Sequence, residues 1–318
     1  METHKNKVLI YGISGQDGSY LAKKYLEKKF IVHGISRKKG KWDKNLKYLD
    51  IKNKIKVFKI NKNFNNLHSI LKNYYKYIIH LGGQSSVIRS YSELEQETFE
   101  SQLLPLQIFL EKLKSQKKNK TKLMFSSSSE IFGYQKKIRL NEKSLKIPQS
   151  PYALSKLIGY EIVKSYREMF NLKVFSIIFF NHESILRNEN FIFKKIFNYL
   201  KNEKFKNKME LGNINVIRDW GPSDEYMKII FKIMKKNKVD DYVLATGNSI
   251  KLKEVIKYFF QTKGLDYKKF IKINKKYFRK YEIKENYADI SKLKKKINIY
   301  PKKNIKDLIN QFISNENK

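Results

Sequence analysis

The chain of 318 residues contains no cysteine. Disulfide bonds, thiolate zinc sites and cysteine nucleophiles are therefore excluded, and this composition suits a reducing cytoplasm, where we expect the protein to be. Long apolar runs are also missing, since the longest, such as residues 174–180, fall far short of the roughly 20 residues that a membrane-spanning helix needs. The start, METHKNKVLIYGISG, lacks the pattern of a secretory signal. We expect no membrane association.

Acidic residues are few, because 30 Asp and Glu stand against 68 Lys and Arg, a formal net charge of +38. Such an excess would suit nucleic-acid binding. The cations are spread along the whole chain, however, and only seven are arginines, whose guanidinium fork base reading favours. We interpret the charge as a lysine-biased composition and expect no dedicated nucleic-acid binding. Hydrophobic residues at 41% exclude a disordered chain.

Short apolar runs alternate with amphipathic stretches along the first 180 residues. We expect strands at residues 7–11, 31–36, 55–60, 77–81, 123–127 and 174–180, and helices at residues 17–28, 67–75, 98–115 and 152–170. This alternation predicts an α/β fold, a Rossmann-type doubly wound parallel sheet with helices on both faces.

The pattern is looser after residue 181, with further helices expected near residues 191–202, 225–236 and 252–262. We therefore divide the chain into two parts. Residues 1–180 would form the domain with the parallel sheet, and residues 181–318 a smaller, interleaved lobe that returns some segments to the first domain.

A glycine-rich turn follows the first expected strand. Gly12, Gly15 and Gly18 are spaced G-x-x-G-x-x-G, and their lack of Cβ atoms lets the backbone approach a pyrophosphate at a helix N-terminus. A tight loop alone could also carry these glycines, but the position between a strand and a helix favours dinucleotide binding. After the second strand, Arg37 and Lys38 replace the acidic residue typical of NAD sites, so NADP is favoured.

A second group of candidate site residues is polar and lies between residues 128 and 156. The strand at 123–127 runs into Ser128, and Tyr152 and Lys156 lie at i and i+4 on one helical face. An ammonium beside the phenol, together with the positive nicotinamide, would lower the tyrosine pKa and let it act as a base. With these motifs the chain resembles the extended short-chain dehydrogenase/reductase family. Glu130 adds the carboxylate that a 4,6-dehydratase needs and that an epimerase or reductase does not.

Within that superfamily the chain resembles the GDP-mannose 4,6-dehydratase family over nearly its whole length. The matching segments are GISGQDGSYLA at 12–22, LGGQSSV at 81–87, SSSSEIFG at 126–133, SPYALSK at 150–156, FNHES at 180–184, LGNINVIRDWG at 211–221 and ATG at 245–247. The resemblance implies an NADP-dependent, redox-neutral 4,6-dehydration of a GDP-sugar, either GDP-mannose or a GDP-manno-heptose. The alternatives are a nucleotide-sugar epimerase or 4-reductase of the same superfamily, and a non-catalytic dinucleotide- or RNA-binding protein.

The resemblance also implies roles for single residues. The catalytic residues would be Ser128, where the family usually has threonine, Glu130, Tyr152 and Lys156. The cofactor would contact Gly12, Ser14, Gly15, Gln16, Asp17, Gly18, Arg37, Lys38, Leu81, Gly82, Gly83, Ser85, Lys156, His182 and Arg187. The substrate would contact Ser85, Asn181, Lys195, Arg218, Arg279 and Glu282. The five histidines are scattered without ligand spacing, so we expect no metal site.

Three further departures from the family stand out. Residues 60–63, Ile-Asn-Lys-Asn, lack the aspartate that usually contacts adenine, although an asparagine could still accept its amino group. Gln96 stands where a cofactor-contacting tyrosine is expected. The segment after Arg37 is shorter than the family's loop for tetramer contacts, so we expect a homodimer, with a tetramer as the alternative. No role is assigned to the remaining arginines, Arg89, Arg139 and Arg167.

Overall fold

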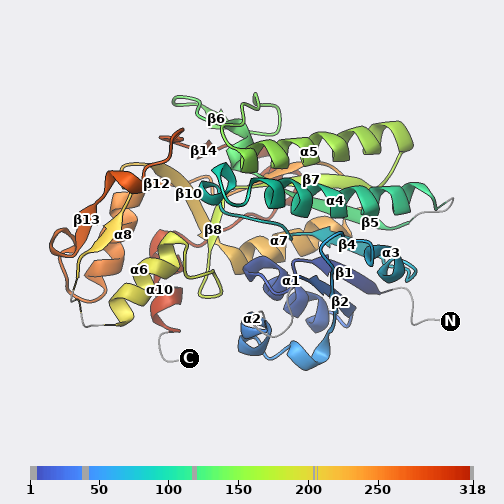
Figure 1. The fold of residues 1–318 in the computed structure, drawn as a ribbon, viewed down its shortest axis with the longest axis horizontal. Helices are drawn as coiled ribbons and strands as arrows, with labels where there is room; N and C mark the ends of the chain where they lie inside the picture. Colours follow the sequence, from blue (N-terminus) through green and yellow to red (C-terminus); the bar gives the residue numbers. More distant parts are fainter. Residues whose placement is uncertain (1–5, 38–42, 117–119, 203–204, 206, 316–318) are drawn as a thin grey trace.

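The computed structural model describes residues 6–37, 43–116, 120–202, 205 and 207–315. Its centre is a seven-stranded sheet in the order β11-β7-β5-β4-β1-β2-β3, with every neighbouring pair parallel (Figure 1). The strands are β1 (Lys7–Tyr11), β2 (Ile31–Ser36), β3 (Lys56–Lys59), β4 (Tyr77–His80), β5 (Lys122–Ser128), β7 (Val174–Phe179) and β11 (Tyr242–Leu244). The predicted α/β class and Rossmann-type sheet are confirmed.

Helices cover both faces of this sheet, and the alternation of side chains along each strand provides both faces with apolar groups. In β1, Val8 and Ile10 are buried in one cluster, and Leu9 and Tyr11 in another. The first cluster includes side chains from α1 (Gln16–Glu27) and α7 (Ser223–Lys235). The second includes side chains from α3 (Leu67–Ile70), α4 (Glu95–Lys114) and α5 (Pro151–Phe170). The sheet is therefore the middle of three layers.

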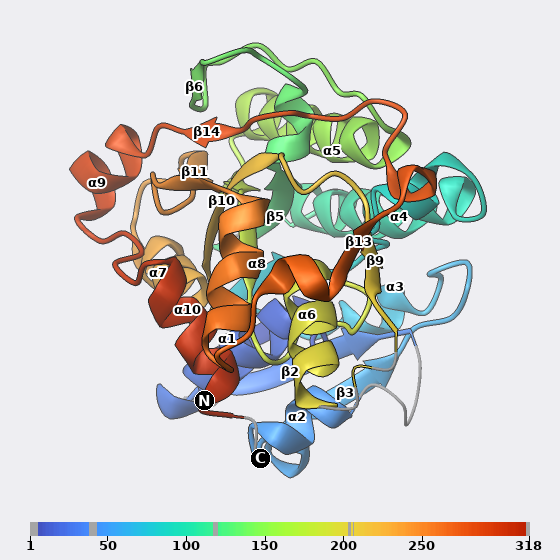
Figure 2. The ribbon, with the colours of Figure 1, turned by 90° about the vertical axis from the view of Figure 1, so that its left-hand side faces the viewer.

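Residues after β7 build a smaller body beside the sheet, at the left of Figure 1 and in front in Figure 2. Its core joins aromatic and aliphatic side chains from three helices, α6 (Ile192–Lys201), α8 (Leu252–Gln261) and α10 (Ile305–Ile313). A three-stranded sheet in the order β12-β10-β8 connects it to the larger body, built from β8 (Asn181–Glu183), β10 (Ile217–Pro222) and β12 (Ser249–Lys251).

Short elements complete the described part of the chain. Two small parallel pairs join β6 (Arg139–Leu140) with β14 (Tyr287–Ala288) and β9 (Met209–Leu211) with β13 (Ile271–Ile273). Two short helices are α2 (Lys44–Tyr48) and α9 (Ser291–Ile297), and the 3-10 turns are η1 (Lys52–Lys54), η2 (Ile88–Tyr91), η3 (Ser129–Phe132), η4 (Tyr267–Lys269) and η5 (Lys275–Tyr277). Since β11 and α7 lie in the larger body, the chain crosses between the two bodies more than once. A domain boundary at residue 180 stays a prediction.

The helix predicted at residues 67–75 was too long, because α3 ends at Ile70. The Asn73 side chain donates a hydrogen bond to the Ile70 carbonyl at 3.1 Å, which satisfies an acceptor at the helix end. Tyr75 then turns into the core, where its hydroxyl lies 2.9 Å from His33 Nδ1. A tyrosine anchored in the core in this way cannot also continue an exposed helix.

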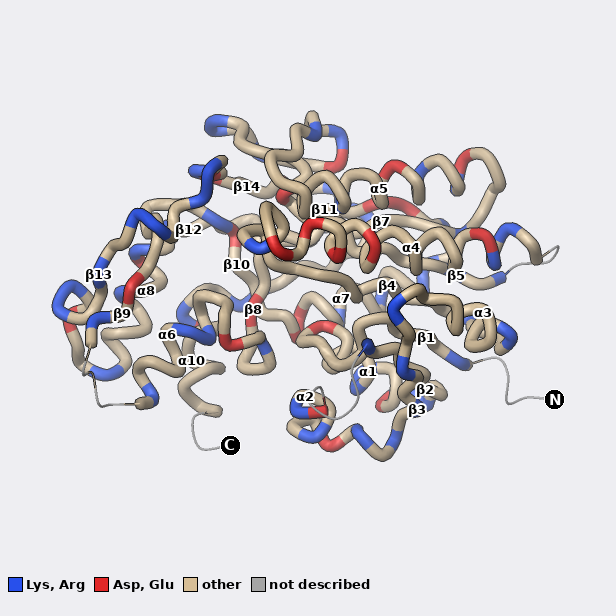
Figure 3. Tube along the Cα trace, viewed as in Figure 1, with Lys and Arg blue, Asp and Glu red and all other residues tan. Residues whose placement is uncertain are grey.

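Lysine and arginine residues are distributed along the trace of both bodies (Figure 3). This distribution agrees with a composition bias more than with a single basic surface. None of the helices in the described ranges combines the length and apolar character that crossing a bilayer requires.

Candidate active site

The candidate site lies where the strand order reverses. From β1 the chain builds β2 and β3 on one side, and β4 and β5 follow on the other side of β1. In parallel α/β sheets, a crevice for ligands opens at the carboxyl ends of the strands at such a switch point. The glycine-rich turn after β1 and the segment Leu81–Gly83 after β4 both lie there.

The glycine-rich turn and the segment after β4 approach each other closely. Gly12 has φ +89°, and a Cβ on it would lie 2.7 Å from the Gly82 backbone. A Cβ on Gly18 would lie 2.2 Å from the Gly12 carbonyl oxygen, and one on Gly15 at 3.3 Å from the same oxygen. Helix α1 begins directly after Gly15. A tight glycine turn at a helix N-terminus is the arrangement that presents backbone N–H groups to a diphosphate, so these residues fit a dinucleotide.

Other predicted cofactor-binding residues lie at the same carboxyl edge of the central sheet. The Ser14 hydroxyl lies 3.2 Å from the Ser36 hydroxyl at the end of β2. Leu81 N donates to the Tyr11 carbonyl at 2.9 Å, and Gly83 takes φ +127°. Ser85 follows this turn and is exposed.

Asp17 is engaged within the protein. It accepts hydrogen bonds from His182 Nε2 at 2.8 Å and from the Ser223 hydroxyl at 2.7 Å. Burial alone would raise its pKa, but His182 and these hydrogen bonds hold the pKa of Asp17 below its usual range. Gln16 extends the network by donating to the His182 carbonyl at 3.2 Å and accepting from Ser184 at 2.8 Å. These bonds join the glycine-rich turn to β8, and cofactor contacts of Gln16, Asp17 and His182 stay predictions.

Ser128 and Tyr152 lie close together, and Lys156 is on the same helix as Tyr152. Ser128 lies at the end of β5, and its side chain hydrogen-bonds that of Tyr152 on α5. Ser128 Oγ also accepts a bond from Glu130 N at 3.3 Å. Burial raises the pKa of Tyr152 to about 12, although the Ser128 bond lowers it. That Lys156 and the nicotinamide together lower this pKa stays a prediction.

Lys156 points to other partners. Its Nζ donates to the Ser126 carbonyl at 2.7 Å and to Gln102 Oε1 at 2.8 Å, and lies 5.9 Å from the centre of the Tyr152 ring. Burial lowers the pKa of Lys156 to about 7. Gln102 was not predicted from the sequence. Its signal was a polar residue on the buried face of α4, where Thr98 and Leu106 lie one turn away on either side.

Glu130 belongs to a cluster of alternating charges. Its carboxylate lies 3.3 Å from Arg279, and Arg218 lies 3.3 Å from Glu282. Burial raises the pKa of Glu282 and lowers that of Arg218, while Glu130 and Glu282 raise the pKa of Arg279 against the effect of burial. The predicted acid/base and three predicted substrate residues are therefore brought together from both bodies.

A cavity of about 380 Å³ adjoins this cluster, since Tyr91 in its wall interacts electrostatically with Glu130 and Arg279. Its lining residues are Tyr91, Pro148, Gln149, Ser150, Pro151 and Tyr281. They include the first residues of α5, directly before Tyr152. The cavity is therefore a candidate place for part of the substrate.

Two further predicted substrate-binding residues, Asn181 and Lys195, lie on β8 and α6. Asn181 pairs with Trp220 in the β8–β10 ladder. Lys195 Nζ donates to the Glu210 carbonyl at 3.1 Å and lies 5.5 Å from the Tyr277 ring centre, near the segment that carries Arg279.

Arg187 and Arg37 each lie beside a carboxylate. Arg187 Nε is 3.6 Å from Glu183, whose pKa burial raises to about 7. Arg37 pairs with Glu97, which was not among the predicted site residues. Lys38 lies outside the described residues.

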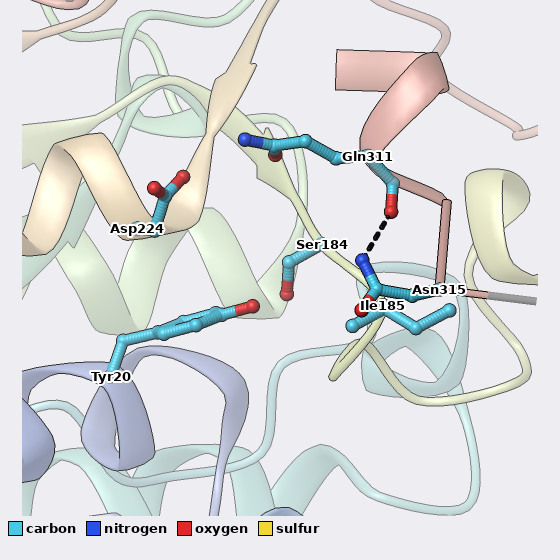
Figure 4. Close-up of a pocket in the computed structure, with 6 residues that line it drawn as sticks. All are labelled: Tyr20, Ser184, Ile185, Asp224, Gln311 and Asn315. Atoms are coloured by element: carbon cyan, nitrogen blue, oxygen red, sulfur yellow. Dashed lines mark hydrogen bonds between the residues drawn. The ribbon is translucent and has the colours of Figure 1, made fainter. Parts of the chain in front are cut away.

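A second, smaller pocket of about 160 Å³ lies between α1, the segment after β8, α7 and α10 (Figure 4). Polar side chains line it, and Ser184 in its wall is the residue that donates to Gln16. Among the residues that the structure describes, no group of three His, Cys, Asp or Glu side chains could hold a metal ion.

A family profile and curated relatives match this chain over nearly its whole length. The profile of the family described as GDP-mannose 4,6 dehydratase matches residues 9–312. GDP-mannose 4,6 dehydratase 1 of Arabidopsis thaliana is 33% identical over 97% of this chain and 89% of its own length. GDP-mannose 4,6-dehydratase of Yersinia enterocolitica is 28% identical over 98% of this chain and 93% of its own length.

Solved structures show the same fold. UDP-glucuronic acid 4-epimerase from Bacillus cereus, in complex with UDP-glucuronic acid and NAD, has a TM-score of 0.86 at 20% identity, with 98% of each chain covered. dTDP-glucose 4,6-dehydratase from Bacillus anthracis, in complex with NAD, has a TM-score of 0.83 at 18% identity, covering 98% of this chain and 97% of its own. From the profile match over nearly its whole length, this chain belongs to the GDP-mannose 4,6-dehydratase family.

Proposed function

We propose that the chain is a nucleotide-sugar 4,6-dehydratase that removes water from GDP-mannose or a GDP-manno-heptose and uses NADP. The observation that carries this proposal is the position of Glu130. It lies beside the Ser128–Tyr152 pair and forms an ion pair with Arg279. A carboxylate at this place supplies the proton transfer at C5 and C6 that dehydration needs beyond redox chemistry at C4.

Tyr152 is the proposed base for the C4 hydroxyl. The Ser128 hydroxyl, bonded to Tyr152, would bind the same substrate oxygen and align it with the phenol. The dinucleotide, when bound, supplies a reversible hydride acceptor, so the sugar is oxidised at C4 and reduced at C6 without net redox change. The Tyr152 pKa would be lowered, against the effect of burial, by the positive charge of a bound nicotinamide.

Glu130 is the proposed acid/base. A ketone at C4 acidifies the C5 proton, which the Glu130 carboxylate removes and then delivers to the departing C6 hydroxyl. In the absence of substrate, Arg279 forms an ion pair with Glu130 at 3.3 Å.

Arg218, Arg279 and Lys195 are the proposed anchors for the substrate diphosphate, and Glu282 for its ribose. Guanidinium forks suit phosphate oxygens, and a carboxylate accepts hydrogen bonds from ribose hydroxyls. In this proposal residues 181–318 mainly bind the substrate and residues 1–180 the dinucleotide. The proposed NADP preference rests on Arg37 and Lys38. The proposed homodimer and cytoplasmic location rest on the short segment after Arg37 and the lack of cysteine.

The test is incubation of the purified protein with GDP-mannose and with a GDP-manno-heptose in the presence of a catalytic amount of NADP⁺. We expect loss of one water from the sugar, detected by mass spectrometry, with no accumulation of NADPH. If neither sugar loses water, the proposal fails. Inversion at C4, or consumption of NADPH in a parallel incubation that supplies NADPH, would instead identify an epimerase or a reductase.

A further inference from the structure

Arg37 and Glu97 form an ion pair between segments that are 60 residues apart in sequence. Arg37 directly follows β2, and Glu97 lies in the first turn of α4. Their side chains are 40% and 42% exposed, so a ligand at this edge can reach both.

This pair lies over the switch point of the sheet. Gly12 N donates to the Ile35 carbonyl at 3.1 Å, so Arg37 comes two residues after the contact between the glycine-rich turn and β2. The start of α4 is fixed to the same place, because the Tyr11 hydroxyl donates to the Ser101 carbonyl at 3.0 Å and Gln84 N donates to the Ser101 hydroxyl at 2.9 Å.

An opposite charge beside Arg37 changes what this edge recognises. Arg37 alone would attract the 2′-phosphate of NADP, which carries nearly two negative charges. The Glu97 carboxylate occupies the guanidinium and repels that phosphate, and it can accept a hydrogen bond from the 2′-hydroxyl of NAD. An acidic residue at the end of β2 would do the same in an NAD site, but here the acid comes from α4.

We propose that Glu97 is the residue that sets dinucleotide selectivity, competing with a 2′-phosphate for Arg37 so that NAD and NADP both bind. This inference rests on the proposed dinucleotide site at the glycine-rich turn. Arg37 alone led us to expect a preference for NADP. In this proposal the selectivity between NAD and NADP depends on Arg37 and Glu97 together.

The test is calorimetric titration of protein freed of copurified nucleotide with NADP⁺ and with NAD⁺. Glu97→Gln removes the negative charge and keeps the size of the side chain, so NADP⁺ should bind roughly tenfold more tightly relative to NAD⁺. Arg37→Gln should shift the ratio in the opposite direction. Adenosine 2′,5′-bisphosphate and 5′-AMP serve as fragments that differ only in the 2′-phosphate, and their affinity ratio should move in parallel.

The matched control is Glu93→Gln. Glu93 lies just before α4 and pairs with Arg89 at 3.0 Å, so this variant also removes an exposed Arg–Glu pair, but at a residue that does not pair with Arg37. Its NADP⁺ to NAD⁺ affinity ratio should equal that of the wild type. An unchanged ratio in Glu97→Gln, with circular dichroism matching the wild type, would overturn the role of Glu97.

Turnover of the GDP-sugars on the same preparations separates this inference from the proposed function. A ratio shift without any turnover rejects the dehydratase proposal and supports the role of Glu97. Turnover with an unchanged ratio rejects the role of Glu97 and supports the dehydratase. If neither dinucleotide binds the wild type, both are rejected.

Discussion

Arginine is scarce in this chain, and all seven guanidinium groups contact a carboxylate or a carbonyl. The four at the proposed ligand sites pair with acids: Arg37 with Glu97, Arg187 with Glu183, Arg218 with Glu282 and Arg279 with Glu130. The other three have local roles: Arg89 pairs with Glu93, Arg139 donates to the Ala288 and Gly247 carbonyls, and Arg167 pairs with Asp241. An incoming phosphate must therefore compete with a carboxylate for each proposed arginine anchor.

Glu130→Gln tests the acid/base at the residue scale. Glutamine keeps the size and can still accept a bond from Arg279, but it cannot take up a proton, so kcat for water loss should fall by roughly two to four orders of magnitude. The measurement is the initial rate of sugar dehydration. Glu168→Gln, an exposed carboxylate farther along α5, is the control and should keep the wild-type rate. A Glu130→Gln rate close to the wild type would assign the proton transfer to another group.

Lys156 makes stability depend on pH. Burial lowers its pKa from 10.5 to about 7 in the folded protein. Between these two pH values the unfolded chain binds a proton that the folded chain lacks, so the free energy of unfolding rises with pH in this window. Below about pH 7 both states are protonated, and this dependence disappears.

Urea unfolding of the cofactor-free protein between pH 7 and 9 measures this effect. Relative to Lys156→Met, the wild type should gain up to about 1.4 kcal/mol in the free energy of unfolding per pH unit. Lys164→Met replaces an exposed lysine on the same helix and should leave the wild-type slope unchanged. Parallel curves for the wild type and Lys156→Met would show that Lys156 keeps an ordinary pKa.

At the scale of elements, the glycine-rich turn works by close approach between two segments. Gly12 and Gly264 both have positive φ, at +89° and +68°. They differ in their surroundings, because a Cβ on Gly12 would meet the Gly82 backbone at 2.7 Å, whereas nothing lies within 4 Å of one on Gly264. Substitutions at these two glycines therefore distinguish the cost of backbone strain from the cost of a steric clash.

Gly264→Ala should cost roughly 1–2 kcal/mol of stability through strain alone and leave dinucleotide binding unchanged. Gly12→Ala must also move the turn or the segment after β4, so it should cost more and abolish detectable dinucleotide binding. Thermal unfolding and calorimetric titration measure the two effects. Equal costs with intact binding in both variants would show that the close approach does not matter.

At the scale of the whole molecule, ion pairs and strand order tie the parts of the chain together. Arg167 on α5 binds Asp241 at 2.7 Å directly before β11, the strand that completes the sheet beside β7. The excess of lysines works against this cohesion, because a formal charge of +38 repels itself across the surface.

Added salt should therefore stabilise the protein. As NaCl rises from about 0.02 to 0.3 M, screening shortens the range of the repulsion, and Tm should rise by a few degrees. Thermal unfolding at pH 7 measures this shift, and a KCl series should agree if screening rather than ion binding is the cause. A falling Tm would show that attractive ion pairs outweigh the repulsion.

Local patterns were enough to predict several parts of this molecule. Residues 8–11 form a continuous apolar run that predicted a buried parallel strand, and the glycines after this run predicted the turn. Local patterns did not predict that α3 ends before residues 71–75, because the bond between Tyr75 and His33 joins residues that are 42 apart in the sequence. Gln102 and Glu97 were not predicted for the same reason. Their partners, Lys156 and Arg37, are far away in the sequence.

The sequence by itself therefore determined the fold class, the order of the strands and helices in the first half and the types of residue that chemistry requires at the site. Short-range spacing decides these features, because helix and strand periods and turn glycines act over a few residues. Only the tertiary structure decided which charges meet. Glu130 with Arg279, Arg218 with Glu282 and Arg37 with Glu97 are neighbours in space alone, and electrostatic interactions follow distance in space.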